Sequence, residues 1–199
     1  MRLHLALDDI LTSKARLSVL RALVLFPGKE FTGRELARFA GVSLAQTQDA
    51  LATLDRAGLA ERRTVGRSHQ WRVVGQNVLW PKLRDLFRAE GSALPDLQQE
   101  LARILEGSPV RKATIFGSVA RGRERADSDL DLFVEVPDAR AEERVSQVLS
   151  SAVVDLGRRY GISVNPIVTA TSRKRRLNPN VLRDVETSGL SIPLVRTSH

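Results

Sequence analysis

Hydrophobic and polar residues follow two different periods along this chain. In residues 13–26 the apolar positions recur every three or four residues until Pro27-Gly28 ends the run, which predicts a helix. In residues 128–136 every second position from Leu130 to Val136 is aliphatic and the positions between are acidic except for Phe133, which predicts a strand with one buried face. We therefore expect an α+β protein, with helices dominating the first half and a sheet in the second.

Two short helices should follow the first one. Residues 32–35 and 43–46 both have the form of a capping box, in which an N-cap hydroxyl and an acid or amide three residues later exchange hydrogen bonds with the backbone. Gly41 and Gly58 are placed to end the two helices. The second helix should be buried through Leu44, Thr47 or Ala50, Leu51 and Leu54. Two short helices joined by a glycine-containing turn predict a helix-turn-helix.

A β-hairpin is expected directly after these helices. Residues 59–64 and 70–74 have strand composition, and the turn between them, Val65-Gly66-Arg67-Ser68, carries an arginine at its tip. A hairpin in this position is a wing. Residues 10–76 therefore resemble the winged helix-turn-helix domains of bacterial and archaeal transcriptional regulators, and we assign residues 1–76 to such a domain.

The resemblance implies double-stranded DNA as a partner, with the second helix of the motif in the major groove and basic residues on the flanking backbone. Polar residues at the start of that helix and arginines along the hairpin are the candidate contacts: Ser43, Gln46, Thr47, Gln48, Arg62, Arg63, Arg67 and Arg72. Helix-turn-helix patterns also occur in protein-interaction modules, and exposed arginines are commonly just solvated.

Residues 77–92 should link this domain to the next one. Apolar residues at helical spacing in 77–88 predict a helix, whose stripe would either form a dimer contact or pack on its own domain. A separate amphipathic helix is expected at residues 94–105, within a second domain over residues 93–199.

The second domain should be a small α/β unit with a mixed sheet. Its expected elements in chain order are a strand at 110–116, a short helix at 118–122, a strand at 128–136, a long helix at 139–160 and a strand at 162–168.

One motif in the second domain contains residues suited to binding phosphate and a metal ion. Gly117-Ser118 follows a strand, and a glycine there lets the backbone approach a phosphate closely. After ten more residues come Asp129 and Asp131, which share one face of a strand at a separation of about 6–7 Å. Such a pair suits a hard cation such as Mg²⁺. Aspartates that merely cap the entry to a strand are the plainer reading.

The spacing of Gly-Ser and Asp-x-Asp, with Ala-Arg-Gly after the serine, resembles the minimal nucleotidyltransferase domains of the DNA polymerase β superfamily over about residues 93–192. The resemblance implies that Gly117 and Ser118 hold a nucleoside triphosphate and that Asp129 and Asp131 are catalytic residues that bind Mg²⁺ or Mn²⁺. Arg121 either helps to bind phosphate or has a structural role.

The chain departs from that family at one position. The family generally uses a third carboxylate on a later strand, and the corresponding position here is Asn165. An amide oxygen can contact a cation, but it is neutral and a poor acceptor for the proton of an attacking hydroxyl. We therefore expect nucleotide binding to be retained while transfer is weak or absent.

Charge and composition limit the kinds of partner, binding site and location that this protein can have. The net charge is +8, and the first 90 residues hold 15 Lys and Arg against 9 Asp and Glu, so the positive field that would attract a polyanion belongs mostly to this half. The absence of cysteine excludes disulfides and thiolate sites, and His4, His69 and His199 are scattered. With no leader-like or membrane-spanning stretch, we expect a cytoplasmic protein that does not bind membranes.

Three functional hypotheses follow. The leading one is a homodimeric DNA-binding regulator whose second domain binds Mg-nucleotide. The second is an active nucleotidyltransferase acting on a protein, RNA or small molecule, with a toxin or other protein partner and an autoregulatory DNA-binding domain. The third is a nucleic-acid-modifying enzyme in which the winged helix delivers the substrate.

Overall fold

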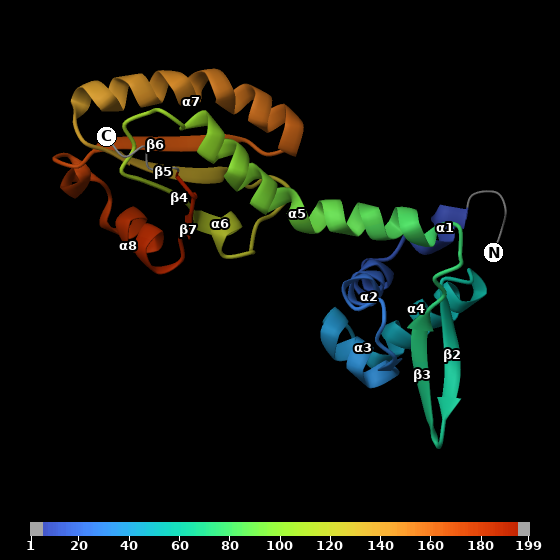
Figure 1. Ribbon diagram of the computed structural model, residues 1–199. Coiled ribbons are helices and arrows are strands. Elements are labelled where there is room, and N and C mark those ends of the chain that lie inside the picture. Colours follow the sequence, from blue (N-terminus) through green and yellow to red (C-terminus); the bar gives the residue numbers. More distant parts are fainter. Residues whose placement is uncertain (1–5, 195–199) are drawn as a thin grey trace. The chain divides into compact units, whose positions relative to one another are not determined.

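The computed structural model describes residues 6–194, so that His4 and His199 lie outside the described residues. The chain divides into two compact units, one up to Gly91 and one from Ser92 onward (Figure 1). The sheet of the second unit contains parallel and antiparallel pairs, which confirms the expected α+β class.

Helices surround a small sheet in the first unit. Its elements are α1 (Ala6–Ile10), α2 (Lys14–Leu25), β1 (Phe31–Thr32), α3 (Gly33–Ala40), α4 (Leu44–Arg56), β2 (Ala60–Val65) and β3 (Ser68–Val73). The three strands are antiparallel in the order β1-β3-β2. The long hairpin of β2 and β3 extends away from the helices (Figure 1), which gives the unit the expected winged helix-turn-helix form.

Both expected capping boxes form. Thr32 Oγ1 accepts from the Glu35 amide at 3.2 Å while the Glu35 carboxylate accepts from the Thr32 amide at 2.8 Å. Ser43 and Gln46 exchange the equivalent bonds at 3.2 and 3.0 Å. These bonds satisfy amides that helix geometry leaves without partners, so each box fixes where its helix begins.

The core of the first unit lies where α2, α3 and α4 meet the sheet. Leu20, Phe31, Leu36 and Leu51 are fully buried there. One prediction about the buried face of α4 is wrong, because Leu44 is 38% exposed. Thr47, expected both as an alternative on that face and among the DNA contacts, is 0% exposed, which confirms the first expectation and contradicts the second. Thr47 lies on the face of α4 that buries Ala50 and Leu51, and its hydroxyl can be buried there because it donates to the carbonyl of Ser43 at 3.0 Å.

A single helix, α5 (Trp80–Ile104), replaces the two helices expected at 77–88 and 94–105. Pro95 lies inside it, where a proline removes one backbone donor and crowds the preceding turn, yet the helix continues through this position. The division between the units falls within this helix, after Gly91. Trp80, Leu83 and Phe87 pack into the core of the first unit, so part of the apolar stripe in this segment covers its own domain. Val78 and Leu86 remain exposed.

The second unit is built around a four-stranded mixed sheet. Its further elements are β4 (Lys112–Phe116), α6 (Gly117–Ala120), β5 (Leu130–Val136), α7 (Ala139–Tyr160), β6 (Val164–Ala170), the 3₁₀ turn η1 (Lys174–Arg176), α8 (Pro179–Thr187) and β7 (Leu190–Ser191). The order is β6-β5-β4-β7, in which only β5 and β6 are parallel.

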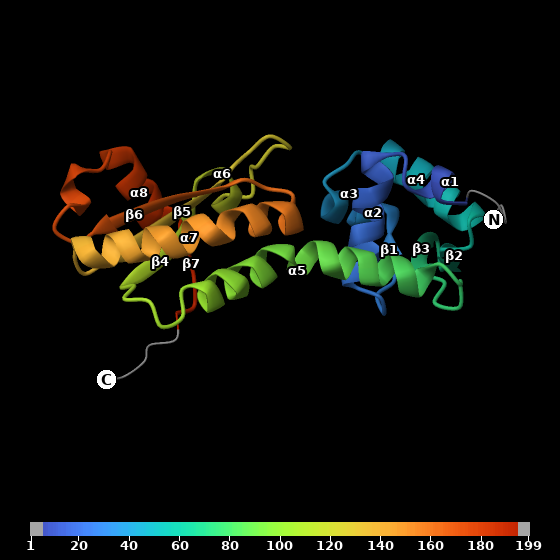
Figure 2. The ribbon, with the colours of Figure 1, turned by 90° about the horizontal axis from the view of Figure 1, so that it is seen from above.

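The alternation along β5 divides the second unit into two layers. Leu130, Leu132 and Val134 face α7 and the second half of α5, which lie side by side and are joined by a 2.8 Å hydrogen bond from the Tyr160 hydroxyl to Glu100 (Figure 2). Phe133 faces the opposite way and packs with residues of α8. Asp131 shares the parity of Phe133, so the α8 side of the sheet carries the candidate site.

Close packing at Gly189 holds α8 against the edge of the sheet. A Cβ at this position would overlap Thr114 on β4 and the carbonyl of Val185 on α8. We expect Gly189→Ala to lower the free energy of unfolding of the second unit by about 1–3 kcal/mol, because neither neighbour is the end of a flexible side chain. Urea denaturation followed by circular dichroism measures this.

Gly91→Ala is the matched control, because nothing lies within 4 Å of a Cβ built there. It makes the same chemical change in a helix, where alanine is favoured over glycine. Equal stability of Gly189→Ala and the wild type would show that α8 is not packed as described.

Candidate functional site

The turn from β4 into α6 is centred on Gly117. Its φ is +80°, a value that favours glycine, and the residue is buried. A Cβ added there would overlap the carboxylate of Asp131 on the neighbouring strand. Glycine is therefore required both by the backbone conformation and by the closeness of Asp131.

Asp129 and Asp131 lie at the start of β5, as the alternation predicts. Asp129 is exposed just before the strand, and Asp131 is half-buried as its second residue. Burial raises the pKa of the Asp131 carboxyl above its ordinary value, and the negative charges of Asp129 and Asp184 raise it further. A cation between Asp129 and Asp131 would relieve this repulsion.

Asn165 lies directly beside Asp131. Strands β5 and β6 are parallel, and their register pairs Asp131 with Asn165. The Asn165 side chain also hydrogen-bonds to the Asp131 carboxylate and so opposes the rise in its pKa. Among residues 6–194 no group of three or more acidic, histidine or cysteine side chains could hold a metal ion. Next to Asp129 and Asp131, strand β6 thus contributes a neutral amide as its oxygen donor.

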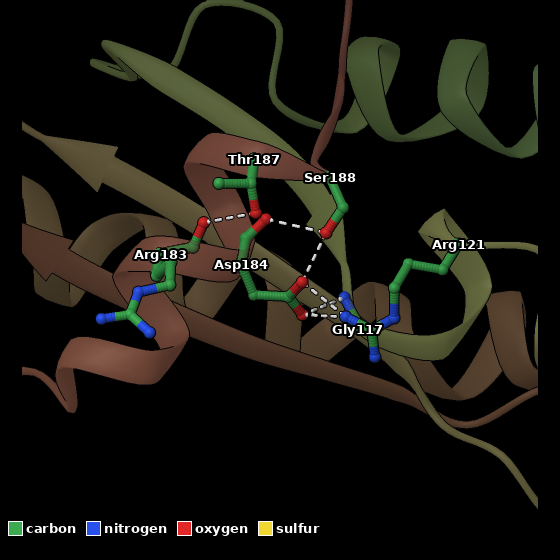
Figure 3. Close-up of polar contacts among 6 residues, drawn as sticks. All are labelled: Gly117, Arg121, Arg183, Asp184, Thr187 and Ser188. Atoms are coloured by element: carbon green, nitrogen blue, oxygen red, sulfur yellow. Dashed lines mark hydrogen bonds and ion pairs between the residues drawn. The ribbon is translucent and has the colours of Figure 1, made fainter.

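Asp184 on α8 is a member of this region that sequence reasoning missed. Its Oδ2 accepts a hydrogen bond from the Gly117 amide at 3.1 Å, and Arg121 Nη1 donates to both of its oxygens at 2.5 Å (Figure 3). The Ser188 hydroxyl donates to Oδ1 as well. The hydrogen bonds from Arg121 and Ser188 hold the pKa of Asp184 below its ordinary value.

These contacts determine which donors of Gly117, Ser118 and Arg121, the three residues expected to bind phosphate, are still unpaired. The Gly117 amide already has a partner, and Arg121 is ion-paired to Asp184 through Nη1. Ser118 differs, because within the described chain its half-buried hydroxyl makes no hydrogen bond. Ser118 therefore has an unused side-chain donor, and Arg121 keeps the guanidinium N–H groups that Asp184 does not use.

The candidate DNA contacts of the first unit lie in two places. Ser43 and Gln46 are exposed at the start of α4, but each uses a side-chain oxygen in the capping box, which leaves the Gln46 amino group to donate outward. Thr47 is buried and cannot reach a base. Gln48 is exposed on the same turn of the helix.

The hairpin arginines also divide into two kinds. Arg63 is 3.4 Å from Glu30, and Arg72 forms a 2.5 Å ion pair with Glu61 on the neighbouring strand. Arg62 and Arg67 are exposed, and in the part of the chain that the structure describes neither has an acidic partner. Two of the four predicted arginines are therefore open to a polyanion.

Comparison with known protein families gives a match within the second unit. Residues 96–180 match the family model of the nucleotidyltransferase domain. A search of curated proteins found no match. Among the described residues no helix is both long and apolar enough to cross a membrane.

Several solved structures show partial likeness to this chain. A toxin-antitoxin crystal structure with AMP-PNP is 17% identical, with a TM-score of 0.35 over 50% of this chain and 74% of that one. A possible transcriptional regulator from Methanosarcina mazei Go1 is 15% identical, with a TM-score of 0.33 over 48% of this chain and 82% of that one. A MarR family transcription regulator is 22% identical, with a TM-score of 0.38 over 77% of this chain and 78% of that one.

The family match, the Gly117-Ser118 turn and the Asp129–Asp131 pair together identify the second unit as a nucleotidyltransferase domain. The predicted resemblance is thereby confirmed for this half. The chain as a whole joins a winged helix-turn-helix unit to that domain.

The raised pKa of Asp131 makes its ionised form a cost to stability. The folded-state pKa lies above the ordinary value of 3.8, so the cost is fully present above the raised pKa and disappears as pH falls below 3.8. We expect Asp131→Asn to raise the free energy of unfolding at pH 7 by less than about 1 kcal/mol, because solvent screens much of the repulsion. The gain should shrink on acidification in urea titrations at several pH values.

Asp127→Asn is the control, because it removes a carboxylate from the exposed loop before β5. It should change stability little at any pH. A wild type more stable than Asp131→Asn at pH 7 would contradict the repulsion described here.

Proposed function

We propose that this protein is a DNA-binding transcriptional regulator whose nucleotidyltransferase domain binds a nucleoside triphosphate with Mg²⁺ and transfers it weakly or not at all. The observation that carries the second part is the amide of Asn165 beside Asp131, where this family generally has a carboxylate. The winged hairpin with its open arginines supports the first part.

The residues of the site fit a divalent cation bound together with a triphosphate. Mg²⁺ is commonly held by one or two carboxylates, with phosphate oxygens and water completing its shell, so Asp129 and Asp131 suffice for binding. Mn²⁺ has the same preference for oxygen ligands. When bound, the cation would neutralise phosphate charge and polarise the phosphoryl group.

The protein's own groups then determine what happens to the nucleotide. The Ser118 hydroxyl can donate to a phosphate oxygen, and Arg121 brings positive charge near it. Transfer also requires a group that accepts the proton of the incoming hydroxyl, and a neutral amide at position 165 does so poorly. The site is thus better suited to holding a nucleotide than to passing it on.

For DNA, we propose that α4 enters the major groove and the hairpin follows the phosphate backbone. The exposed start of α4 offers Gln46 and Gln48 to base edges, while Arg62 and Arg67 are open for phosphates. Recognition of a palindromic site would require a homodimer. A toxin or other protein partner would be revealed by co-purification.

The nucleotide proposal predicts binding that depends on both aspartates. Isothermal titration with ATP, GTP, CTP and UTP in the presence of Mg²⁺ should give a measurable Kd for at least one of them. Asp129→Ala and Asp131→Ala should each weaken it by about tenfold or more, because each removes a charged cation ligand. Labelled triphosphate should transfer little onto protein, RNA or small-molecule acceptors.

Asn165→Asp is the informative variant. It restores a carboxylate beside Asp131, so we expect transfer to rise while nucleotide affinity changes less. Robust transfer by the wild type that Asp129→Ala abolishes would instead identify an active enzyme. No nucleotide binding by the wild type would refute the proposal for this domain.

The DNA proposal predicts affinity that falls steeply with salt for the DNA upstream of the protein's own gene. Arg67→Ala and Arg62→Ala should each weaken binding several-fold and reduce the slope of log K against log salt by about 1, because each removes one phosphate contact. Arg72→Ala should have a smaller effect, since Arg72 is already paired with Glu61. Fluorescence anisotropy at several salt concentrations measures both quantities.

Arg158→Ala is the matched control. It removes the same charge from the exposed surface of α7 in the other unit. Equal losses for Arg158→Ala and Arg67→Ala would mean that binding depends on net charge alone and that the hairpin has no special role.

A further inference from the structure

The carboxylate of Asp184 accepts hydrogen bonds from several separate parts of the second unit. Its two oxygens accept hydrogen bonds from three donors: the Gly117 amide, Arg121 Nη1 and the Ser188 hydroxyl (Figure 3). The first two donors lie 67 and 63 residues away in the sequence. The contact therefore fixes the turn after β4 to the closing helix α8.

The contact uses only one side of Arg121. Nη1 alone donates to Asp184, and in the described chain the remaining guanidinium N–H groups of Arg121 have no hydrogen-bond partner. A guanidinium that is already fixed in place loses less rotamer entropy when a ligand binds than a freely moving one does. Asp184 thus holds the guanidinium in one place and leaves its other donors available.

The Gly117 amide is not itself a good place for a phosphate. Gly117 is buried, with the Asp131 carboxylate against its Cα and the Asp184 carboxylate on its N–H. A phosphate there would meet two negative charges. The half-buried hydroxyl of Ser118 and the outer side of Arg121 are the accessible donors.

We propose that Asp184 is a positioning residue for the triphosphate: by holding the Gly117 amide and one side of Arg121, it aims Arg121 and Ser118 at the phosphates. This inference rests on the proposed nucleotide binding. The alternative use of the same contacts is competition, in which Asp184 occupies donors that the phosphates need. The two roles predict opposite changes in nucleotide affinity. Loss of a positioning group weakens nucleotide binding, whereas loss of a competitor strengthens it.

The test is the affinity of the full chain for the nucleotide that the wild type binds best, measured with Mg²⁺ by isothermal titration. Asp184→Ala should weaken binding by about tenfold. Asp184→Asn keeps one oxygen that can accept from Gly117 or Arg121, so it should bind better than Asp184→Ala. Asp155→Ala, which removes an exposed carboxylate from α7, should bind as the wild type does.

A double-mutant cycle separates positioning from simple loss of structure. If Asp184 acts through Arg121, Asp184→Asn should have little further effect in an Arg121→Ala background, while thermal melting shows both variants folded. Because the cycle uses Asp184→Asn, it tests the inference even if Asp184→Ala does not fold.

Three outcomes would overturn the inference while leaving the proposed function intact: tighter binding by Asp184→Ala or Asp184→Asn, unchanged binding by these variants, or fully additive effects of Asp184→Asn and Arg121→Ala. Failure of the wild type to bind any nucleotide would instead overturn the proposed function, and this inference with it.

Discussion

The left-handed backbone of Gly117 is the constraint on which the site in the second unit depends. Because the residue has no Cβ, the Asp131 carboxylate can pack against its Cα while the Asp184 carboxylate takes its amide. One position thereby joins strand β4, strand β5 and helix α8. A side chain there would force the Asp131 carboxylate away from the turn.

Sequence reasoning reached the parts of the site that depend on local spacing. Gly117 and Asp131 could be assigned because a turn after a strand and an alternating strand each have a fixed geometry. Asn165 could be assigned because it falls on the next strand of a parallel pair. Asp184 could not, since no local pattern specifies a hydrogen bond between residues 67 positions apart. The same limit explains α5, where nothing in the sequence showed that the helix would pass through Pro95.

In the first unit, DNA contacts are difficult to assign from the sequence because the same residue types serve two purposes. Ser and Gln at a helix start are the types that cap a helix and also the types that contact DNA. The sequence marks Ser43 and Gln46 for both, and the structure shows the capping bonds. Thr47 satisfies its hydroxyl on the backbone and joins the core. Arg62 and Arg67 have no capping or pairing role among the described residues, so they carry the DNA proposal further than the helix start does.

The neutral side chain of Asn165 has a physical consequence for the domain as well as for catalysis. A carboxylate there would set a further negative charge beside Asp131, whose pKa is already raised by burial and by Asp129 and Asp184. The amide instead donates a hydrogen bond to Asp131 and stabilises its ionised form. The domain can therefore keep the carboxylates of Asp129 and Asp131 near each other with less repulsion than a third carboxylate at position 165 would impose. In the function we propose, such a site would bind a charged ligand reversibly, which suits a domain joined to a winged helix-turn-helix unit.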